Sequence, residues 1–446
     1  MTLSNNLPGC PAQHDTDALP VNIAQALVRQ WISPLVATER VPLREALGRV
    51  LASPIDSPLA VPAHDNSAMD GFAFSSAALQ AASAASTSSV PELELAVVGR
   101  ALAGHPWRGD VGSMQCVRIT TGAWLPDACD TVIPHEQVEQ TPHAIRFSAA
   151  AVRGGANCRR AGEDLQAGQI ALTAGRIVRA ADLGLLASLG ISTVNVRRRL
   201  RVAFFSTGDE LRSPGEPLDP GCVYDSNRHT LFALLQRMNC DTLDLGIVRD
   251  EPAALDAALR TAVAHADVVL TSGGVSAGEA DFTQTLLQTR GEIAFRGLAL
   301  RPGRPLTFGR IHPDKPAESP ADGQLDTTRA TLFFGLPGNP VAVMVTFALI
   351  VRDALLALAG AQPQPVTLLG ARSRVLLRKR AGRTEYPRGI ASRGSDGQWQ
   401  VAPTGSQSSG ALNTMSEANC FIVLSHEQTD VSPGEMVDIM LFDGLF

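Results

Sequence analysis

The stretch DVVLTSGGVSAGEADFT, from Asp267 to Thr283, predicts a buried strand, a tight turn and the start of a helix. Val268–Leu270 is a short apolar run, typical of a parallel strand that is covered on both faces. Thr271–Gly274 interrupts that run, and apolar residues resume at helical spacing in Phe282–Gln288. A glycine-rich turn between a strand and a helix presents free backbone N–H groups, which favour an anion such as phosphate.

Two carboxylates follow this turn. Glu279 and Asp281 would repel a phosphate directly, but they suit a divalent cation such as Mg²⁺ that bridges carboxylate and phosphate oxygens. The alternative is an ordinary acidic first turn, because carboxylates stabilise helix N-termini in general. The loop by itself leaves both interpretations open.

The alternation of strands and helices continues on both sides of this stretch. Between residues 201 and 360 the sequence predicts strands at Arg201–Ser206, Thr242–Val248, Ile293–Leu300 and Thr331–Phe334, and helices at Ser226–Met238, Pro252–His265 and Val341–Ala359. Strands that alternate with helices of this length predict a doubly wound, mostly parallel sheet. A segment rich in Pro and Asp, 312–328, is predicted to be a surface insertion.

The rest of the chain predicts further parts around this α/β domain. We expect a flexible tail at 1–20, a small α/β linker domain from 21–51 and 169–200, a β-rich domain at 52–168, a doubly wound domain at 201–360 and a C-terminal β-barrel-like domain at 361–446. The expected fold class is therefore multidomain α/β.

Several local elements of these outer parts are also predicted. Val21–Trp31, Leu43–Leu51 and Val178–Leu189 have helical patterns, whereas the Ala/Ser-rich run Ala77–Ser89 is expected to be a flexible surface loop. The cluster Arg197–Arg199 is expected to be a solvated linker. Short β-like runs are expected at Leu93–Val98, Cys116–Thr120 and Ala144–Phe147.

Composition narrows the functional classes. The 446 residues carry a net charge of −6 and are 45% hydrophobic, 18% charged and 5% aromatic, which argues against a nucleic-acid-binding protein. The seven cysteines are scattered without a CxxC pair, so neither a disulfide framework nor a zinc site is expected. No run is expected to be long and apolar enough to span a membrane, and we expect a cytoplasmic protein.

The chemically unusual motifs of residues 201–340 each follow a predicted strand: STGDE, RD, TSGGVSAGEAD, RPGRP and LPGNP. In an open parallel sheet, ligands bind beyond the carboxyl ends of the strands. Arg301 and Arg304 can bind phosphate or another oxyanion, while Glu210, Asp250 and Asp281 offer hard oxygen ligands to Mg²⁺. The sequence therefore predicts a site at this edge of the sheet.

Each motif also has a local alternative. Asp250 and Asn339–Pro340 are suited to begin helices, Glu210 can be an exposed charge at a helix start, and the two arginines can form surface ion pairs of little energetic value. The motifs GxxxxGK[ST], GxGxxG after a strand and HExxH are absent from the sequence, so P-loop, dinucleotide and zincin functions lack support.

Eight motifs, in this order, resemble the molybdopterin molybdenumtransferase family, the bacterial MoeA-type proteins that are also found as the E domain of gephyrin. They are DNSAMDG at Asp65–Gly71, TGAWLPDACDTVI at Thr121–Ile133, RRAGEDL at Arg159–Leu165, STGDEL at Ser206–Leu211, YDSNR at Tyr224–Arg228, SGGVSAGEADF at Ser272–Phe282, and the later PGRP and LPGNP. The resemblance covers the chain from about Asn22 to Phe446.

The resemblance implies an activity and an assembly. Such proteins take adenylylated molybdopterin and molybdate, insert molybdenum at the dithiolene sulfurs, release AMP and require Mg²⁺. They are elongated homodimers of four-domain subunits, whose active cleft lies between the doubly wound domain of one subunit and the β-rich domain of the other. Other partners would be the adenylyltransferase that precedes this step and the apoproteins of molybdoenzymes.

The resemblance also implies site residues. The catalytic set would be Asp65, Thr121, Asp164, Glu210, Asp250 and Asp281, of which Glu210, Asp250 and Asp281 would hold the metal. The substrate-binding set would be Ser272, Gly273, Gly274, Ser276, Arg301, Arg304, Pro337, Gly338, Asn339, Pro340 and Ser409.

The sequence departs from the family in a few places. Arg301 and Arg304 stand where many relatives have lysine, Gly297 stands where another lysine is common, and Phe72 stands where tyrosine is common.

Two alternative functions share part of this set of motifs. One is the adenylyltransferase of the same pathway, against which the DNSAMDG loop and the flanking domains argue, and the other is a non-catalytic scaffold.

Overall fold

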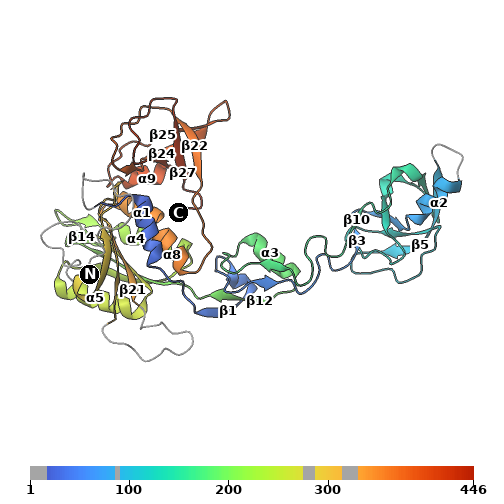
Figure 1. Ribbon diagram of the computed structural model, residues 1–446, viewed down its shortest axis with the longest axis horizontal. Coiled ribbons are helices and arrows are strands. Elements are labelled where there is room, and N and C mark those ends of the chain that lie inside the picture. Colours follow the sequence, from blue (N-terminus) through green and yellow to red (C-terminus); the bar gives the residue numbers. More distant parts are fainter. Residues whose placement is uncertain (1–17, 86–90, 275–286, 314–329) are drawn as a thin grey trace. The chain divides into compact units, whose positions relative to one another are not determined.

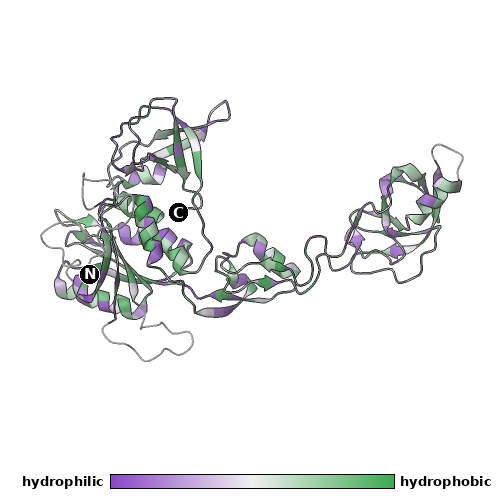
Figure 2. Ribbon diagram, viewed as in Figure 1, coloured by the Kyte–Doolittle hydropathy of each residue, from purple (hydrophilic) through white to green (hydrophobic). Residues whose placement is uncertain are grey.

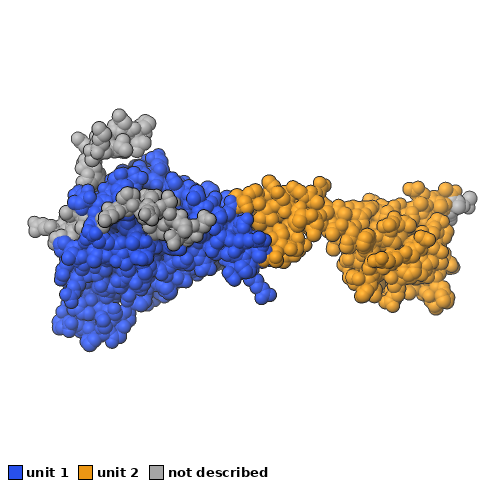
Figure 3. All heavy atoms as spheres, turned by 90° about the horizontal axis from the view of Figure 1, so that it is seen from below, with its two compact units in different colours: residues 1–52, 175–179, 193–446 blue, residues 53–174, 180–192 orange. Residues whose placement is uncertain are grey.

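The computed structural model describes residues 18–85, 91–274, 287–313 and 330–446. The chain divides into two compact units: residues 1–52, 175–179 and 193–446 form the first, and residues 53–174 and 180–192 form the second (Figure 3). Most of the predicted tail and insertion lies outside the described residues, as does the predicted helix start at Phe282. The division into five segments that the sequence suggests stays a prediction.

A six-stranded sheet, with the order β16-β13-β17-β21-β20-β18, forms the centre of the first unit (Figure 1). Its strands are β13 (Arg201–Thr207), β16 (Asp241–Val248), β17 (Val268–Ser272), β18 (Gly291–Arg296), β20 (Thr307–Ile311) and β21 (Thr331–Leu336). Strands β16, β13, β17 and β21 are parallel, and β20 is antiparallel to both of its neighbours. β18 therefore runs in the same direction as the parallel strands, and the predicted mostly parallel sheet is confirmed.

Helices cover both faces of this sheet because its central strands are apolar on both sides. Val202 and Phe204 of β13 lie in one hydrophobic cluster together with α4 (Asn227–Arg237). The intervening residues, Ala203 and Phe205, lie in a second cluster with α5 (Pro252–His265). Alternate side chains of one strand thus reach opposite faces, as strand geometry requires, and the sheet is doubly wound.

A long apolar helix follows β21 and packs in the core. It consists of α7 (Pro340–Thr346), a π-helical turn (Phe347–Val351) and α8 (Arg352–Leu358). Helix α1 (Val21–Gln30), which the sequence predicted, contacts both the π-helical turn and α8 (Figure 1). Contrary to expectation, Pro340–Leu358 has the length and apolar composition of a membrane span (Figure 2). However, 72% of its most apolar window is buried inside the unit, as in the core helix of a soluble protein, so the helix is weak evidence for a membrane span.

The segment that follows α1 is less helical than its sequence pattern predicted. Strand β1 (Thr38–Pro42) pairs with β12 (Thr193–Arg197), and only the short 3₁₀ turn Leu43–Ala46 occupies the predicted helix 43–51. Gly48 has φ +74°, a left-handed conformation that ends any helix at this point. Val50 and Leu51 then form β-bridges, so the helix predicted there is wrong.

The arginine cluster that precedes β13 is not simply a solvated linker. Arg198 donates from both terminal nitrogens to Asp267, with N–O distances of 2.7 and 2.8 Å, and the two side chains are only 10% and 5% exposed. Asp267 also accepts from the backbone N–H of Arg201 at 2.8 Å. This buried pair holds the start of β17 against the start of β13, which a charge run in the sequence does not reveal.

The second unit is built on a six-stranded sheet with the order β7-β4-β6-β5-β9-β8. Its strands are β4 (Gly71–Phe74), β5 (Glu92–Ala101), β6 (Gln115–Ile119), β7 (Thr131–Pro134), β8 (Glu139–Gln140) and β9 (Ala144–Ser148). The three predicted β-like runs are therefore confirmed. Helix α3 (Ala180–Ser188), also in this unit, confirms the helical pattern predicted at 178–189.

The Ala/Ser-rich segment of the second unit forms a helix, α2 (Ala77–Ala85), and the predicted flexible loop is wrong for these residues. Alanine is the best helix former, and Ala78 and Leu79 are buried in the hydrophobic cluster of the sheet. Residues 86–90, the rest of the predicted loop, lie outside the described residues.

The last part of the chain closes into a five-stranded barrel, β22-β25-β24-β26-β27, and confirms the predicted β-barrel-like domain. Its strands are β22 (Leu368–Ser373), β24 (Arg388–Arg393), β25 (Trp399–Pro403), β26 (Cys420–Val423) and β27 (Met436–Leu441). A short parallel pairing between β19 (Leu300–Arg301) and β23 (Thr384–Glu385) joins the barrel to the RPGRP loop.

Candidate functional site

A pocket of about 230 Å³ lies at the carboxyl ends of the parallel strands. It is lined by Thr207, Gly208, Glu210, Leu211, Asn227, Asp250, Ser272, Gly273, Gly274, Pro305, Pro337 and Gly338. Seven of the predicted site residues are in this wall: Glu210, Asp250, Ser272, Gly273, Gly274, Pro337 and Gly338. The loops after β13, β16, β17 and β21 thus meet in one place, as the predicted sheet required. Below, we call this the carboxyl-edge pocket.

The turn after β17 favours glycine at both Gly273 and Gly274. Gly273 and Gly274 have φ values of +88° and +65°, which other residues rarely adopt. A Cβ atom on Gly273 would also overlap the carbonyl oxygen of Thr207 on the neighbouring strand. The backbone of this loop can therefore approach both β13 and a ligand closely.

Two side chains at the N-terminal end of α4, Asp225 and Asn227, form hydrogen bonds to the strands and loops around the pocket. Asn227 donates from Nδ2 to Ser272 Oγ at 2.7 Å and to the carbonyl oxygen of Gly338 at 2.6 Å, so it joins the loops after β17 and β21. Asp225 accepts from Ser206 Oγ at 3.0 Å and from the backbone N–H of Arg228 at 3.2 Å. The Oδ1 atom of Asn227 is buried and has no hydrogen-bond partner among the described residues.

The acidic residues of the pocket are exposed at its rim. Asp250 Oδ1 accepts a 2.6 Å hydrogen bond from Thr207 Oγ1, which leaves the second carboxylate oxygen open to another partner. Glu210 follows Gly208, which has φ +151°, and a Cβ atom on Gly208 would overlap the Glu210 carboxylate. Glu210 and Asp250 are thus presented by two neighbouring loops. Asp281, the third predicted metal ligand, lies outside the described residues, as do Ser276 and Glu279.

No group of three His, Cys, Asp or Glu side chains in the described parts of the chain is arranged to hold a metal ion. The two acids that face the carboxyl-edge pocket still fit Mg²⁺, which binds through one or two carboxylates together with phosphate oxygens and waters.

The RPGRP loop reaches the same edge of the sheet, because β18 ends and β20 begins there. Pro305 lines the carboxyl-edge pocket, but Arg301 and Arg304 do not. Gly297, at the start of this loop, has φ +76°, where a lysine would be strained.

Phe72 is fully buried in the core of the second unit, so the hydroxyl group of a tyrosine at this position would have no access to solvent.

Arg301 lines a second pocket, of about 270 Å³, between the RPGRP loop and the barrel. Arg388 in its wall is fully buried and donates to Thr414 Oγ1 and to the carbonyl oxygens of Ser406 and Ser408, at 2.6 to 3.1 Å. No carboxylate pairs with Arg388 within the described ranges, and burial lowers the pKa of its guanidinium group. A buried, unpaired cation of this kind favours an anionic ligand. We call this the arginine pocket.

Asn339, Pro340 and Ser409 have backbone roles at the start of α7. Pro340 is the first helical residue and Asn339 is the capping residue, but the Asn339 side chain makes no capping hydrogen bond. The carbonyl oxygen of Ser409 accepts from the backbone N–H of Val341 at 3.1 Å. None of the three lines either pocket.

Asp65, Thr121 and Asp164 belong to the second unit. Asp65 accepts from the backbone N–H of Ala161 at 2.8 Å and from Arg160 at 2.6 Å, and these two bonds lower its pKa. Thr121 donates from its backbone N–H and its hydroxyl group to Asp70, both at 2.7 Å.

The motifs that carry these residues are interlocked by backbone hydrogen bonds. The backbone N–H of Leu125 donates to the carbonyl oxygen of Asp65 at 2.9 Å, and that of Gly122 donates to the carbonyl oxygen of Ser67 at 2.8 Å. The backbone N–H of Asp164 donates to the carbonyl oxygen of Val61 at 3.0 Å, while the Asp164 side chain is exposed. The structure therefore joins the motifs of Asp65, Thr121 and Asp164 within the second unit.

Sequence reasoning missed two functional candidates. Asn227 was not among the predicted site residues, although it lies in the YDSNR motif at the start of the predicted helix Ser226–Met238. Arg388 had no local signal at all, because its importance comes from burial in the barrel without an acidic partner among the described residues.

Three family models match the chain in succession. They are described as MoeA N-terminal region (domain I and II), over residues 19–190, probable molybdopterin binding domain, over 203–357, and MoeA C-terminal region (domain IV), over 371–442.

Individual relatives match most of the chain. A protein of Haemophilus influenzae named molybdopterin molybdenumtransferase is 38% identical over 92% of this chain and 95% of its own length. A protein of the same name from Nostoc sp. is 35% identical over 96% of this chain and 93% of its own length. A crystal structure of a molybdopterin biosynthesis MoeA protein from Pyrococcus horikoshii OT3 is 26% identical, has a TM-score of 0.76 and covers 95% of this chain and 100% of that protein. On these matches, together with the fold and the motifs, the chain belongs to the MoeA family.

Proposed function

We propose that this chain inserts molybdenum from molybdate into adenylylated molybdopterin and releases AMP. The observation that carries the proposal is the carboxyl-edge pocket, where two exposed carboxylates and a glycine turn meet at the end of a parallel sheet. The name that its relatives share, molybdopterin molybdenumtransferase, supports the same reaction.

The phosphate groups of the substrate would bind at the glycine turn. Gly273 and Gly274 let the backbone approach a ligand closely, and Ser272 Oγ is fixed by the bond from Asn227. The unpartnered Oδ1 atom of Asn227 can accept a hydrogen bond from an amino or hydroxyl group of the substrate. This loop therefore binds and orients the substrate, while the chemistry takes place beside it.

Glu210 and Asp250 would hold Mg²⁺, with Asp281 as the third proposed ligand. The bound cation would neutralise negative charge on the substrate as AMP leaves. The chain itself positions these carboxylates, because Thr207 fixes Asp250 Oδ1 by a 2.6 Å hydrogen bond and leaves its other oxygen available. Asp250 is thus pre-positioned, and Glu210 lies on the neighbouring loop.

The molybdate oxyanion would bind in the arginine pocket. Arg388 supplies a buried guanidinium group without an acidic partner in the described part of the chain, and Arg301 supplies a second one in the same wall. Nε and Nη2 of Arg388 already donate within the barrel, so Nη1 is the nitrogen that can donate to an oxyanion beside Arg301. A desolvated site strengthens such a charge-assisted hydrogen bond. An Arg388→Met variant should require a much higher molybdate concentration for half-maximal AMP release.

We further propose a homodimer in which Asp65, Thr121 and Asp164 of one subunit serve the pocket of the other. Asp65 and Thr121 are already held by hydrogen bonds within their own unit, so they can be presented as a rigid group. Mixing an inactive Asp65→Asn protein with an inactive Asp250→Asn protein should restore up to about a quarter of the activity through mixed dimers, by simple statistics of subunit exchange. Analytical ultracentrifugation gives the oligomeric state independently.

The decisive experiment follows AMP release under anaerobic conditions, with purified protein, adenylylated molybdopterin and Mg²⁺. Release that depends on molybdate, and that is lost in Glu210→Gln and Asp250→Asn proteins, is the expected result. Release that is independent of molybdate, or transfer of AMP from ATP to bare molybdopterin, would contradict the proposal. We expect the reaction to take place in the cytoplasm, with the preceding adenylyltransferase and molybdoenzyme apoproteins as partners.

A further inference from the structure

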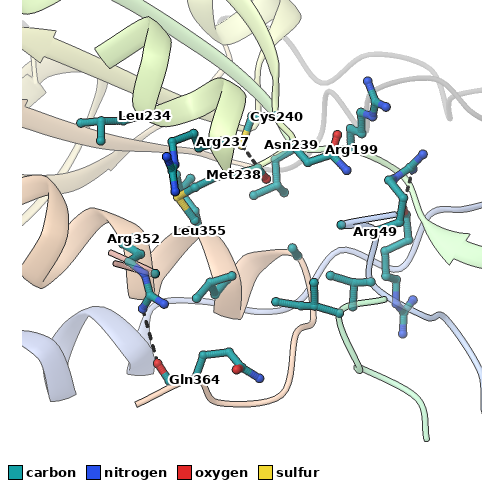
Figure 4. Close-up of a pocket in the computed structure, with 18 of the residues that line it drawn as sticks. Arg49, Arg199, Leu234, Arg237, Met238, Asn239, Cys240, Arg352, Leu355 and Gln364 are labelled. Carbon is teal, nitrogen blue, oxygen red and sulfur yellow. Dashed lines mark hydrogen bonds between the residues drawn. The ribbon is translucent and has the colours of Figure 1, made fainter. Parts of the chain in front are cut away.

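A third cavity, of about 350 Å³, lies within the first unit and shares no lining residue with the other two pockets. It is formed by the end of α4, by α8, by the segment that leads from β12 into β13, and by residues 48–50 and 444–446 (Figure 4). Its volume is in the range of about 300–1,000 Å³ that is typical of small-molecule sites. We call it the hinge cavity, because it lies where the β1–β12 ladder meets the helices of the sheet domain.

The wall of the hinge cavity is strongly cationic. Six arginines line it: Arg49, Arg197, Arg198, Arg199, Arg237 and Arg352. Among the described residues, none of the lining side chains is acidic, although the whole protein has a net charge of −6. Cations gathered in one concave wall focus a positive potential that attracts anions.

Only part of this charge is neutralised by neighbouring acids. Arg198 is fully paired with the buried Asp267, and Arg49 forms a close ion pair with Glu39. Arg199 lies 3.6 Å from Asp241, but both side chains are well exposed, so this pair neutralises little charge.

Two further arginines are in excess, and a third shares its partner. Arg237, in the last turn of α4, makes no hydrogen bond or ion pair with any described residue, and Arg197 donates to the carbonyl oxygen of Val36 at 3.0 Å. Arg352 contacts Asp353 at 3.1 Å, but Asp353 is also contacted by Arg29 at 3.4 Å. Within the described residues, Arg237 and Arg197 therefore have no carboxylate side chain as a partner.

The floor of the cavity between the arginines is apolar. Leu234 and Leu355 are buried there, and Met238 lies beside them between Arg237 and Arg352 (Figure 4). Guanidinium groups on either side of an aliphatic surface match a ligand that has an anionic group attached to a flat, apolar body.

We propose that the hinge cavity binds a small organic phosphate with an aromatic ring, the phosphate at Arg237 and Arg352 and the ring on Leu234, Met238 and Leu355. This site is separate from the carboxyl-edge and arginine pockets, and the proposal does not depend on the proposed reaction.

The test uses 1-naphthyl phosphate as the probe and isothermal titration calorimetry on the full chain at low ionic strength. Two control compounds isolate the two features of the ligand: 1-naphthol lacks the charge, and inorganic phosphate lacks the ring. The probe should bind at least about tenfold more tightly than either control compound, because charge-assisted hydrogen bonds and ring burial each contribute. Equal dissociation constants for the probe and either control compound overturn the proposal.

A variant pair tests the location. Arg237→Gln should weaken probe binding about tenfold, since it removes the uncompensated guanidinium group and keeps helix propensity. Arg153→Gln, at an exposed position of the second unit, changes the net charge equally and should leave binding unchanged. In hydrogen exchange, the probe should protect residues 234–240 and 352–359. Protection of 207–211 and 272–274 instead, or unchanged binding by Arg237→Gln, contradicts the assignment.

Discussion

Asn227 offers the sharpest test of how the carboxyl-edge pocket is held together. Its side chain is 8% exposed and joins two loops, through hydrogen bonds of 2.7 Å to Ser272 Oγ and 2.6 Å to the carbonyl oxygen of Gly338. An Asn227→Ala protein loses both bonds at once. It also loses Oδ1, which we propose accepts a hydrogen bond from the substrate.

The expected cost follows from what the alanine leaves behind. A buried polar group that loses its partner costs about 1–3 kcal/mol, and Ser272 Oγ keeps one weaker bond, of 3.3 Å, to Pro337. We therefore expect the local stability of the two loops to fall by about 1–3 kcal/mol. One lost hydrogen bond to the substrate should lower kcat/KM for AMP release by a further factor of about ten.

Native-state hydrogen exchange is the appropriate assay, because a chain with two compact units need not unfold in one step. Amides of residues 268–274 and 332–340 should exchange about 5- to 150-fold faster in the variant, which corresponds to the same 1–3 kcal/mol. The matched control is Asn195→Ala, an exposed position on β12, which should change neither exchange nor activity. Unaltered exchange in the Asn227→Ala protein would refute the bridging role, and unaltered kcat/KM would refute the role in binding.

Three further predictions concern other residues. Gly273→Ala should abolish substrate binding and lower stability by several kcal/mol, because the new Cβ atom would overlap the Thr207 carbonyl oxygen at φ +88°; calorimetric titration with the substrate measures this. The pKa of Asp65 is lowered in the folded state, so its ionised carboxylate stabilises the fold at neutral pH, and this contribution is lost as the pH falls below 3.8. In an Asp65→Asn protein, the free energy of unfolding of the second unit should therefore fall less at acidic pH, as measured by unfolding curves. Burial raises the pKa of the Cys158 thiol to about 11, so iodoacetamide at pH 8 should label it much more slowly than the same residue in urea.

The sequence predicted the sheet domain well because each strand there is a short, continuous apolar run and each motif follows a strand. Glu210, Asp250 and Ser272 could be assigned to one edge from strand direction alone, since the carboxyl ends of parallel strands coincide. The same reasoning predicted that Arg301 and Arg304 bind phosphate or another oxyanion at this edge, and that role stays a prediction. It could not foresee that β19 pairs with the barrel and carries Arg301 into a different pocket.

The failures have a common physical origin. The alanine-rich segment was predicted to be a loop because its composition is of low complexity, yet alanine has the highest helix propensity and Leu79 is buried against the sheet. Residues 43–51 have a helical pattern, but the positive φ of Gly48 ends the helix. Arg198 and Arg388 look like surface charges in the sequence. Their roles depend on burial, which only the tertiary structure determines.

Strand β17 shows how the fold and the site depend on each other. The strand is apolar in the middle, but a buried polar connection fixes each end: Asp267 to Arg198 before the strand, and Ser272 to Asn227 at its last residue. Apolar packing alone would leave the position of the strand along its own axis weakly specified, because neighbouring register shifts bury similar area. The two polar connections remove that freedom, since breaking a buried ion pair or hydrogen bond is costly. The glycine turn that follows β17 therefore has a fixed position relative to the neighbouring strands and to the carboxyl-edge pocket. The exposed Glu210 and Asp250 carboxylates are not needed to hold the loops and remain available for the ligand.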